Sequence, residues 1–488
     1  MQPTSHRRAG RVTVLLLGLA ALSATALPAA YAAPGTTERV SVASDGTQAD
    51  NISGRRGAPT SSADGRLVAF DSLASNLVPG DANGFDDVFV RDRATGTTQR
   101  VSVASDGTQG NNISSSPAIS GDGRFVAFVS NASNLVPGDT SGVRDIFVHD
   151  RATGTTQRVS VSSSGAQGNG ASGGSGATND VATIAPAISA DGRFVAFESL
   201  ASNLVPGDTN GTRDVFVHDL QTATTERVSV GGNKQQANSF SNPESINGDG
   251  RFVVFTSFAS NLVKGDTNQQ IDVFVRDRQA RTTQRVSVSG DNQQADGSST
   301  RADSSADGRF VVFASAATNL VPGDTNGTDD VFVRDLQAGT TQRVSVSSSG
   351  AEADGGSPSN GIRGGIRFGP AISANGRLVV FDSQATNLVP DDTNTCSQQG
   401  AYSFTVPGSC PDVFVHDLAT GSTARVSVDT AAAQANDAST DPAISGDGSV
   451  VAYFSAASNL VAGDTNFCTV GVVSFGGGHC PDIFVHTG

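Results

Sequence analysis

The chain has 488 residues, with 32 Lys or Arg against 47 Asp or Glu, a formal net charge of −15. So acidic a balance argues against binding to nucleic acid, which requires a basic surface that displaces counterions. Tryptophan is absent, so the Trp on which many sugar-binding sites stack a ring is missing.

The N-terminus has the pattern of a secretory signal peptide. A segment with three arginines precedes an apolar run from Val12 to Leu27, and small residues follow through Ala32. The run is shorter than the ~20 residues that cross a bilayer. We therefore predict a signal peptide at 1–32 and a mature chain, 33–488, that is secreted or periplasmic, has no membrane span and is monomeric.

One block of sequence recurs along the mature chain. In one copy, Asp-Gly-Arg-Phe-Val-Ala-Phe at 122–128 leads to Ser-Asn-Leu-Val-Pro-Gly-Asp at 133–139, Asp-Ile-Phe-Val at 145–148 and Arg-Val-Ser-Val at 158–161. Self-similarity at a fixed period is the signature of a repeat architecture. The Asp/Asn-Gly element of the block occurs seven times, at Asp64, Asp122, Asp191, Asp249, Asp307, Asn375 and Asp447.

Each block is expected to form β-strands. Short apolar runs such as Phe-Val-Ala-Phe, bounded by turn residues, predict strands, and runs that are apolar on both faces indicate sheets buried on both sides. We predict four strands per block, in one copy at 117–120, 124–130, 145–150 and 155–161, with the Asp-Gly pair as a tight hairpin between the first two. The predicted fold is an all-β, seven-bladed β-propeller with blade cores near 58–103, 117–161, 185–230, 243–288, 302–346, 370–428 and 442–488.

The two ends of the mature chain are complementary. Residues 36–42 have the sequence of a fourth strand that no blade precedes, and 481–488 have that of a third strand that no fourth strand follows. A ring must join its ends without leaving a sheet edge open. We therefore predict that 36–42 form the outer strand of the last blade.

The inner Pro-Ala-Ile-Ser segment, the Asp-Gly-Arg hairpin and the Asp-Val-Phe-Val strand together resemble the TolB-type WD40-like (PD40) repeat family, over essentially the whole mature chain. The resemblance implies a secreted or periplasmic propeller that binds other proteins of the cell envelope. The sequence departs from TolB because no α/β domain precedes the blades and because a loop like Asn-Leu-Val-Pro-Gly-Asp occurs in every blade. Membership of the Tol system is therefore not implied.

The variation between blades falls on one face. In a propeller, the connections between strands 2 and 3 and from strand 4 to the next blade emerge together, and the long insertions occupy these connections at 162–183, 347–369, 395–411 and 467–481. Variable loops on a rigid scaffold usually carry binding. The alternative is that insertions accumulate where they do least harm.

Cysteines bracket the last two insertions in equivalent places, as Cys396 with Cys410 and Cys468 with Cys480. An even cysteine count at matched spacing in an exported protein predicts disulfides, so we expect these two pairs. No Cys-x-x-Cys motif supports a zinc site instead.

The bracketed loops also carry apolar residues, and rigid aromatic groups favour protein interfaces. The alternative is a small local core under each loop. The binding-face candidates are Tyr402, Phe404, Val406, Val470, Val472 and Phe475.

A second candidate site is the pattern Asp-x-Asn/Ser-x-x-x-Asp in the first five blades. Carboxylate and amide oxygens around a glycine turn suit calcium. The pattern lacks the distal Glu of an EF-hand loop, and Asp and Asn also stabilise turns without metal. Calcium is thus the one cofactor that the sequence offers, as an alternative to turn formation. The residues concerned are Asp81, Asn83, Asp87, Asp139, Ser141, Asp145, Asp208, Asn210, Asp214, Asp266, Asn268, Asp272, Asp324, Asn326 and Asp330.

No convincing catalytic constellation is present. Glu244 and Asp303 are expected on the inner strands of neighbouring blades, where a solvated channel would accept their charges or where they would act as an acid pair. Because irregular residues gather in the loops rather than the channel, we predict a non-catalytic scaffold that binds a protein or cell-envelope component through the loop-rich face. The alternatives are a calcium-binding propeller and an extracellular glycan-processing enzyme that acts at the central channel.

Overall fold

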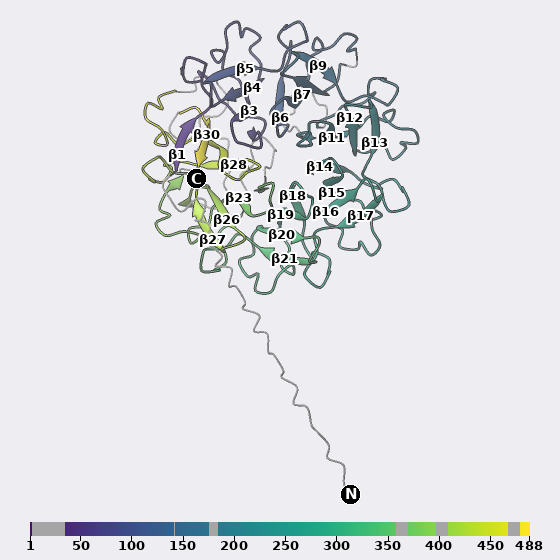
Figure 1. The fold of residues 1–488 in the computed structure, drawn as a ribbon, viewed down its shortest axis with the longest axis vertical. Coiled ribbons are helices and arrows are strands. Elements are labelled where there is room, and N and C mark those ends of the chain that lie inside the picture. Colours follow the sequence, from purple (N-terminus) through teal and green to yellow (C-terminus); the bar gives the residue numbers. More distant parts are fainter. Residues whose placement is uncertain (2–34, 141, 175–183, 358–368, 397–407, 467–478) are drawn as a thin grey trace.

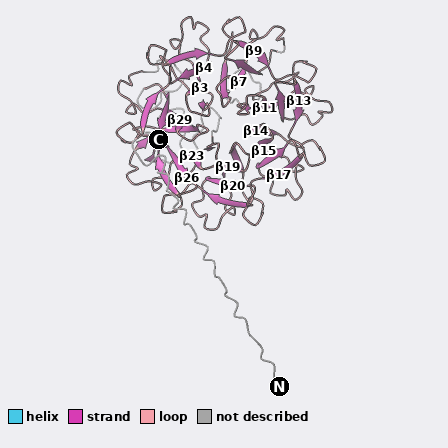
Figure 2. Cartoon of the chain, viewed as in Figure 1, coloured by secondary structure: helices cyan, strands magenta, loops and turns pink. Residues whose placement is uncertain are grey.

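The computed structural model describes Met1 and residues 35–140, 142–174, 184–357, 369–396, 408–466 and 479–488. The regular elements in these ranges are all β-strands (Figure 2). Seven four-stranded sheets stand around a ring (Figure 1), and a two-stranded sheet is added to one of the connections. Within these ranges, no helix is long and apolar enough to cross a membrane.

Blade 2 illustrates the repeat. Its strands β6 (Ser114–Ile119), β7 (Phe125–Ser130), β8 (Asp145–Asp150) and β9 (Thr155–Arg158) pair in that order, all antiparallel. The blades are numbered along the chain, from blade 1 (β2–β5) to blade 7 (β28, β29, β30 and β1). The remaining strands are β1 (Thr36–Arg39), β2 (Thr60–Ser61), β3 (Leu67–Ser72), β4 (Asp87–Asp92), β5 (Thr97–Arg100), β10 (Ala187–Ile188), β11 (Phe194–Ser199), β12 (Asp214–Asp219), β13 (Thr224–Arg227), β14 (Ser241–Ile246), β15 (Phe252–Ser257), β16 (Asp272–Asp277), β17 (Thr282–Arg285), β18 (Ser299–Ser304), β19 (Phe310–Ser315), β20 (Asp330–Asp335), β21 (Thr340–Arg343), β22 (Ala371–Ile372), β23 (Leu378–Ser383), β24 (Thr395–Cys396), β25 (Gly408–Ser409), β26 (Asp412–Asp417), β27 (Ser422–Arg425), β28 (Ser439–Ile444), β29 (Val450–Ser455) and β30 (Asp482–Thr487).

The inner and outer strands differ in extent from the predicted ones. The outer strand of blade 2 ends at Arg158. Beyond it, the N–H of Val159 still donates to the carbonyl of Ile146 at 2.9 Å, and the Ser160 hydroxyl donates to Asp145 at 2.6 Å. The inner strand starts earlier than predicted and is interrupted by a register shift between Ser115 and Ala118. Such bulges re-aim side chains at the end of a strand.

Each pair of neighbouring blades shares one hydrophobic core. Between blades 1 and 2, Val88 and Val90 of β4 pack with Val126 and Phe128 of β7, all of them buried. Seven such clusters link the blades, and one of them joins blade 7 to blade 1. The prediction that the sheets are buried on both faces is therefore confirmed.

The ring closes as the sequence predicts. Strand β1 pairs antiparallel with β30, with Thr36 opposite Thr487 and Arg39 opposite Phe484, and the two strands lie side by side in Figure 1. The Ser41 hydroxyl adds a hydrogen bond of 2.6 Å to Asp482. The outer edge of β30 is thereby paired, as the third strand of every other blade is paired with its fourth.

Blade 7 carries a hydroxyl group in the repeated aromatic core. Tyr453 stands where the other six blades have Phe in a stacked pair. Its buried hydroxyl lies near the Thr37 side chain but makes no hydrogen bond of normal geometry. Leaving a buried hydroxyl unpaired costs about 1–3 kcal/mol. We expect Tyr453→Phe to raise the free energy of unfolding by about 1–2 kcal/mol, measured by denaturant titration. The matched control, Phe381→Tyr in blade 6, should lower it; a loss of stability in Tyr453→Phe would contradict the assignment.

Candidate binding face

The loop-bearing face is the face from which the connections between strands 2 and 3, and those from strand 4 to the next blade, emerge. The predicted disulfide between Cys396 and Cys410 is present there, with a Cα–Cα distance of 4.9 Å. Its two cysteines close a short ladder in which β24 pairs with β25. Cys480 is also in a disulfide, and its predicted partner Cys468 lies outside the described residues. So do the six predicted binding-face candidates, Tyr402, Phe404, Val406, Val470, Val472 and Phe475.

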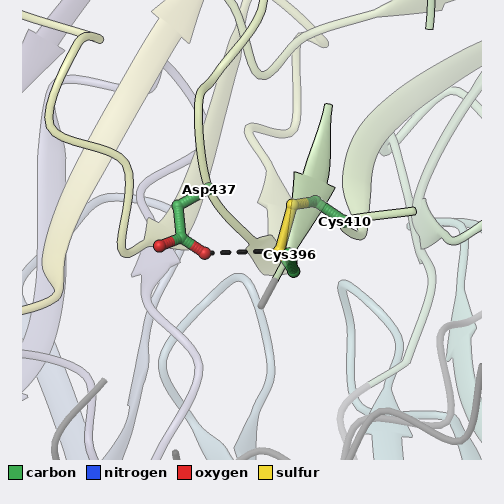
Figure 3. A group of neighbouring side chains, drawn as sticks. All are labelled: Cys396, Cys410 and Asp437. Atoms are coloured by element: carbon green, nitrogen blue, oxygen red, sulfur yellow. Dashed lines mark hydrogen bonds between the residues drawn. A yellow bond between two sulfur atoms is a disulfide. The ribbon is translucent and has the colours of Figure 1, made fainter. Parts of the chain in front are cut away.

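A carboxyl group from the next blade meets the described disulfide. Asp437, which precedes β28, places Oδ1 3.3 Å from the Cys396 sulfur (Figure 3). A disulfide sulfur carries no proton to donate, so the two atoms are in close contact. The same Oδ1 accepts a hydrogen bond from the N–H of Ala438 at 2.8 Å, and burial raises the pKa of Asp437. Cys396, Cys410 and Asp437 lie close enough to share a metal ion, but both sulfurs are committed to the disulfide. This contact between blades 6 and 7 was not predicted from the sequence.

The predicted calcium ligands come together around an arginine that was also missed. In blade 3, Asp208 and Asp214 lie 3.1 and 3.2 Å from Nη1 of Arg227 at the end of β13. Asn210 and Ser229 donate to the two oxygens of Asp214 at 2.8 and 2.5 Å. The carboxylates are therefore paired within the protein, and calcium would have to compete with the guanidinium. The same arginine occurs in each blade, as Arg39, Arg100, Arg158, Arg227, Arg285, Arg343 and Arg425.

Blade 5 is the most acidic version of this network. Glu352 stands where blade 1 has Gln109, and its carboxylate joins those of Asp324 and Asp330 around Arg343. Burial and the neighbouring Asp330 raise the pKa of Asp324 to about 6. Calcium binding stays a prediction for these clusters, and blade 5 is the one where it would relieve the most repulsion. Ser141, one member of the predicted set, lies outside the described residues.

Glu244 and Asp303 lie on inner strands as the sequence suggested and are partly exposed, but both carboxyl groups are also hydrogen-bonded within the protein. Glu244 accepts hydrogen bonds from Thr256 at 2.8 Å and from the backbone N–H of Ala302 in the next blade at 3.3 Å. Asp303 likewise accepts from the N–H of Ile372 in blade 6 at 3.0 Å. Burial raises the pKa of Glu244 to about 7 and that of Asp303 to about 6. Each carboxyl thus ties its inner strand to the next blade.

Charged side chains that the sequence analysis missed gather where the strands end at the loop-bearing face. They occupy two positions of the repeat: the residue before the last of strand 2, and the residue before strand 3. The core positions hardly vary between blades, whereas these two positions do. A comparison of equivalent positions in the sequence would therefore have identified them. Their ionisable members are Asp71, Asp86, Arg144, Glu198, Arg213, Asp329 and Asp382.

Glu198 is the most constrained of them, with its residue fully buried. One carboxyl oxygen accepts from the N–H of Gly174, and the other, Oε2, has no hydrogen-bond partner. Burial raises the pKa of Glu198 to about 7, although Arg213 and Arg144 oppose the shift. In blade 1 the corresponding carboxyl, Asp71, accepts from the N–H of Ser116 on the next inner strand at 3.4 Å. In blade 4 the residue equivalent to Ser116 is Pro243, which has no N–H to donate to Glu198.

The buried carboxyl of Glu198 gives a pH-dependent prediction. Its pKa in the folded state, about 7, exceeds the usual 4.5, so its stabilising contribution is complete below pH 4.5 and is lost as the pH rises through 7. Relative to Glu198→Gln, the wild type should lose up to about 3 kcal/mol of unfolding free energy between pH 5 and pH 8. Chemical denaturation at several pH values measures this difference. The control is Glu226→Gln, whose parent side chain is 53% exposed; an equal pH trend in both variants would refute the assignment.

The junction of blades 3 and 4 has an aromatic surface. The rings of Phe240 and Phe258 stack with centroids 6.0 Å apart and an interplanar angle of 6°. The guanidinium of Arg213 lies over the ring of Phe240, 5.2 Å from its centroid. Phe258 is 45% exposed and the nearby Leu200 40%. Neither residue belonged to the predicted binding face.

No protein-family model matches the sequence, and no curated protein matches it. Among solved structures, TolB from Acinetobacter baumannii is 16% identical over 74% of this chain, with a TM-score of 0.38, and the match spans 63% of the TolB chain. Oligogalacturonate lyase from Vibrio parahaemolyticus is 12% identical over 93% of this chain and 97% of its own, with a TM-score of 0.49. The β-propeller domain of the Trilobed protease from Pyrococcus furiosus is 12% identical over 84% of this chain and 91% of its own, with a TM-score of 0.47. The activity of each belongs to that protein, and what this chain's own sheets establish is an all-β, seven-bladed β-propeller.

Proposed function

We propose that this protein is an exported scaffold that binds another protein of the cell envelope or its surroundings through the loop-bearing face. One observation carries the proposal. Apart from Met1, the large hydrophobic side chains exposed among the described residues are Phe85, Leu200 and Phe258, at 38–45%. All three lie in connections between strands 2 and 3. Exposed apolar anchors gathered on one face are characteristic of interaction surfaces.

The framework beneath this face is cross-linked by ion pairs and a disulfide, and a preorganised surface loses less conformational entropy on binding. The arginine networks hold the connection between strands 2 and 3 against strands 3 and 4 in each blade, and the Cys396–Cys410 disulfide closes another connection. The opposite face is built from repeated short turns. A groove of about 420 Å³ opens there beside Arg309 and Leu336, away from the residues that vary between blades.

Site-specific photo-crosslinking tests the proposal. A photoreactive amino acid is placed at Phe85 on the loop-bearing face and, as a matched control, at the exposed Thr95 in a turn of the opposite face. Irradiation of the producing cells should give covalent protein adducts from position 85 and none from position 95. Adducts confined to position 95, or none from either position, would overturn the proposal.

Export makes a separate prediction. If the signal peptide is removed after Ala32, N-terminal sequencing of the protein from the culture medium or periplasm should begin at Ala33. Full-length protein retained in the cytoplasm would contradict this part of the proposal.

A further inference from the structure

We propose that the junction of blades 3 and 4 on the loop-bearing face binds an acidic polypeptide segment that carries an aromatic or aliphatic anchor residue. This inference rests on the proposed function and names the chemistry of the partner. The site, here the blade 3–4 strip, consists of Leu200, Arg213, Phe240 and Phe258, with Lys234 and Lys264 on the adjoining loops.

The strip is continuous across the two blades. Leu200 and Arg213 extend the β11–β12 pair by one residue beyond Ser199 and Asp214, which lie opposite each other. Arg213 reaches across the junction to the Phe240 ring, which stacks on Phe258. The guanidinium of Arg213 and the rings of Phe240 and Phe258 therefore form one layered surface, in which Phe258 is the most exposed.

Only this junction carries an aromatic pair at these two positions. In blade 4 the N–H of Phe258 donates to the carbonyl of Phe240 at 3.2 Å. Phe258 is the residue after strand 2, and Phe240 precedes the serine at the start of the inner strand. Each blade has the equivalent hydrogen bond. The equivalent pairs in the other blades are Leu73 with Ile52, Asn131 with Ile113, Leu200 with Ala171, Ala316 with Ser298, Gln384 with Gly356 and Ala456 with Ala438.

The charge around the strip favours an acidic partner. Lys234 and Lys264 are the only lysines of a chain whose net charge is −15, and both are exposed. Their loops are held together by Asn261, which donates to the carbonyl of Gln236 at 2.9 Å and accepts from the N–H of Asn238 at 3.0 Å.

The acids near this cluster are already neutralised or buried. Asp266 is paired with Arg285, and Glu198 lies beneath Arg213 with its pKa raised by burial. Arg213 in the strip and the two exposed lysines on the loops that Asn261 joins are cationic groups on an otherwise acidic protein, and such groups attract acidic segments toward this side of the ring.

The apolar part of the strip favours a polypeptide over a glycan. The aliphatic side chain of Leu200 offers a sugar no hydrogen bond, and Phe258 has no polar group at its tip. Both suit an aromatic or aliphatic side chain, whose burial is worth about 1.5–3 kcal/mol. An anionic glycan would use the lysines but not Leu200.

Three labelled decapeptides test the proposal by fluorescence anisotropy against the mature protein. The first has six Asp or Glu residues around one Phe, the second replaces the acids with Lys, and the third replaces Phe with Ala. The first should bind at least about tenfold more tightly than the others. Phe258→Ser should weaken it by about tenfold or more, and the pair Lys234→Gln and Lys264→Gln should weaken it and reduce its salt dependence. The control Phe85→Ser, which removes another exposed Phe, from blade 1, should leave the binding of the first peptide unchanged.

Equal binding of the basic peptide, no binding of the acidic peptide, or insensitivity to Phe258→Ser would overturn the inference. Tighter binding of alginate, an anionic polysaccharide, with the same dependence on Phe258 would replace the polypeptide with a glycan. Adducts from position 85 together with a failed peptide test would leave the proposed function standing and refute only the blade 3–4 strip. Absence of adducts from position 85 would refute the proposed function, whereas the peptide measurements alone decide the blade 3–4 strip.

Discussion

Replacing Arg227 with alanine should lower the free energy of unfolding by about 3–5 kcal/mol, because it leaves buried carboxylates without their counter-charge. Arg227 lies within 3.2 Å of Asp208 and Asp214, whose side chains are 5% and 0% exposed. Burial already raises the pKa of both carboxyls, and Arg227 lowers it. Without the arginine, the carboxyls must be protonated or the loop that carries Asp208 must leave strand 3. Equilibrium denaturation at pH 7 measures the loss.

The matched control is Arg66→Ala on the opposite face. Arg66 also pairs with an aspartate, Asp92, at 2.6 Å, but its side chain is 49% exposed. Exposed ion pairs contribute about 0–1 kcal/mol. The two variants remove the same group from the same kind of pair and differ in burial. Equal losses would contradict the view that the arginine network supports the loop-bearing face.

Deleting residues 33–42, which include β1, should abolish cooperative folding of the monomer. The deletion exposes the edge of β30, removes the buried Val40 from the core shared by blades 7 and 1, and leaves Asp464 and Asp482 without Arg39. The lost ion pairs and apolar burial together exceed about 5 kcal/mol, comparable with the whole stability of many domains. Calorimetry should show no sharp transition, and the exposed edge should promote aggregation.

A circular permutant tests whether the pairing of β1 with β30, and not the position of the chain ends, holds the ring together. It begins at Gly46, in a turn with positive φ, and joins Gly488 to Gly35 by a short turn, since Thr36 and Thr487 lie opposite each other. The permutant keeps β1 on β30 and should melt like the mature protein. If the permutant fails while the deletion variant folds normally, closure by β1 is not what holds the ring.

The repeat and its closure could be predicted because both are written in short segments of sequence. Asp-Gly turns and apolar runs mark each blade, and the incomplete first and last segments showed how the ring closes. The arginine partner of the aspartates was missed because Arg227 and Asp214 are 13 residues apart and meet only through the register of strands 3 and 4. Asp437 was missed for the same reason, since it reaches the Cys396 sulfur from another blade.

The candidate site was only partly predictable. The sequence favoured the loop-bearing face and placed the anchors in the cysteine loops, at positions that lie outside the described residues; that this face binds a partner stays a prediction. The exposed Phe258 and the buried Glu198 are recognised only when equivalent positions of all blades are compared, since an apolar run does not reveal which of its members faces solvent. Glu244 and Asp303 were correctly placed on inner strands, but their hydrogen bonds to the next blade depend on how the blades pack.

Hydrogen–deuterium exchange of the mature protein with and without its captured partner tests the loop-bearing face most directly. Binding should slow amide exchange at the ends of the strands on that face, above all in 238–242 and 256–262 of blade 4, and leave the turns at 93–97 and 151–155 unchanged. Protection confined to those turns would contradict the account.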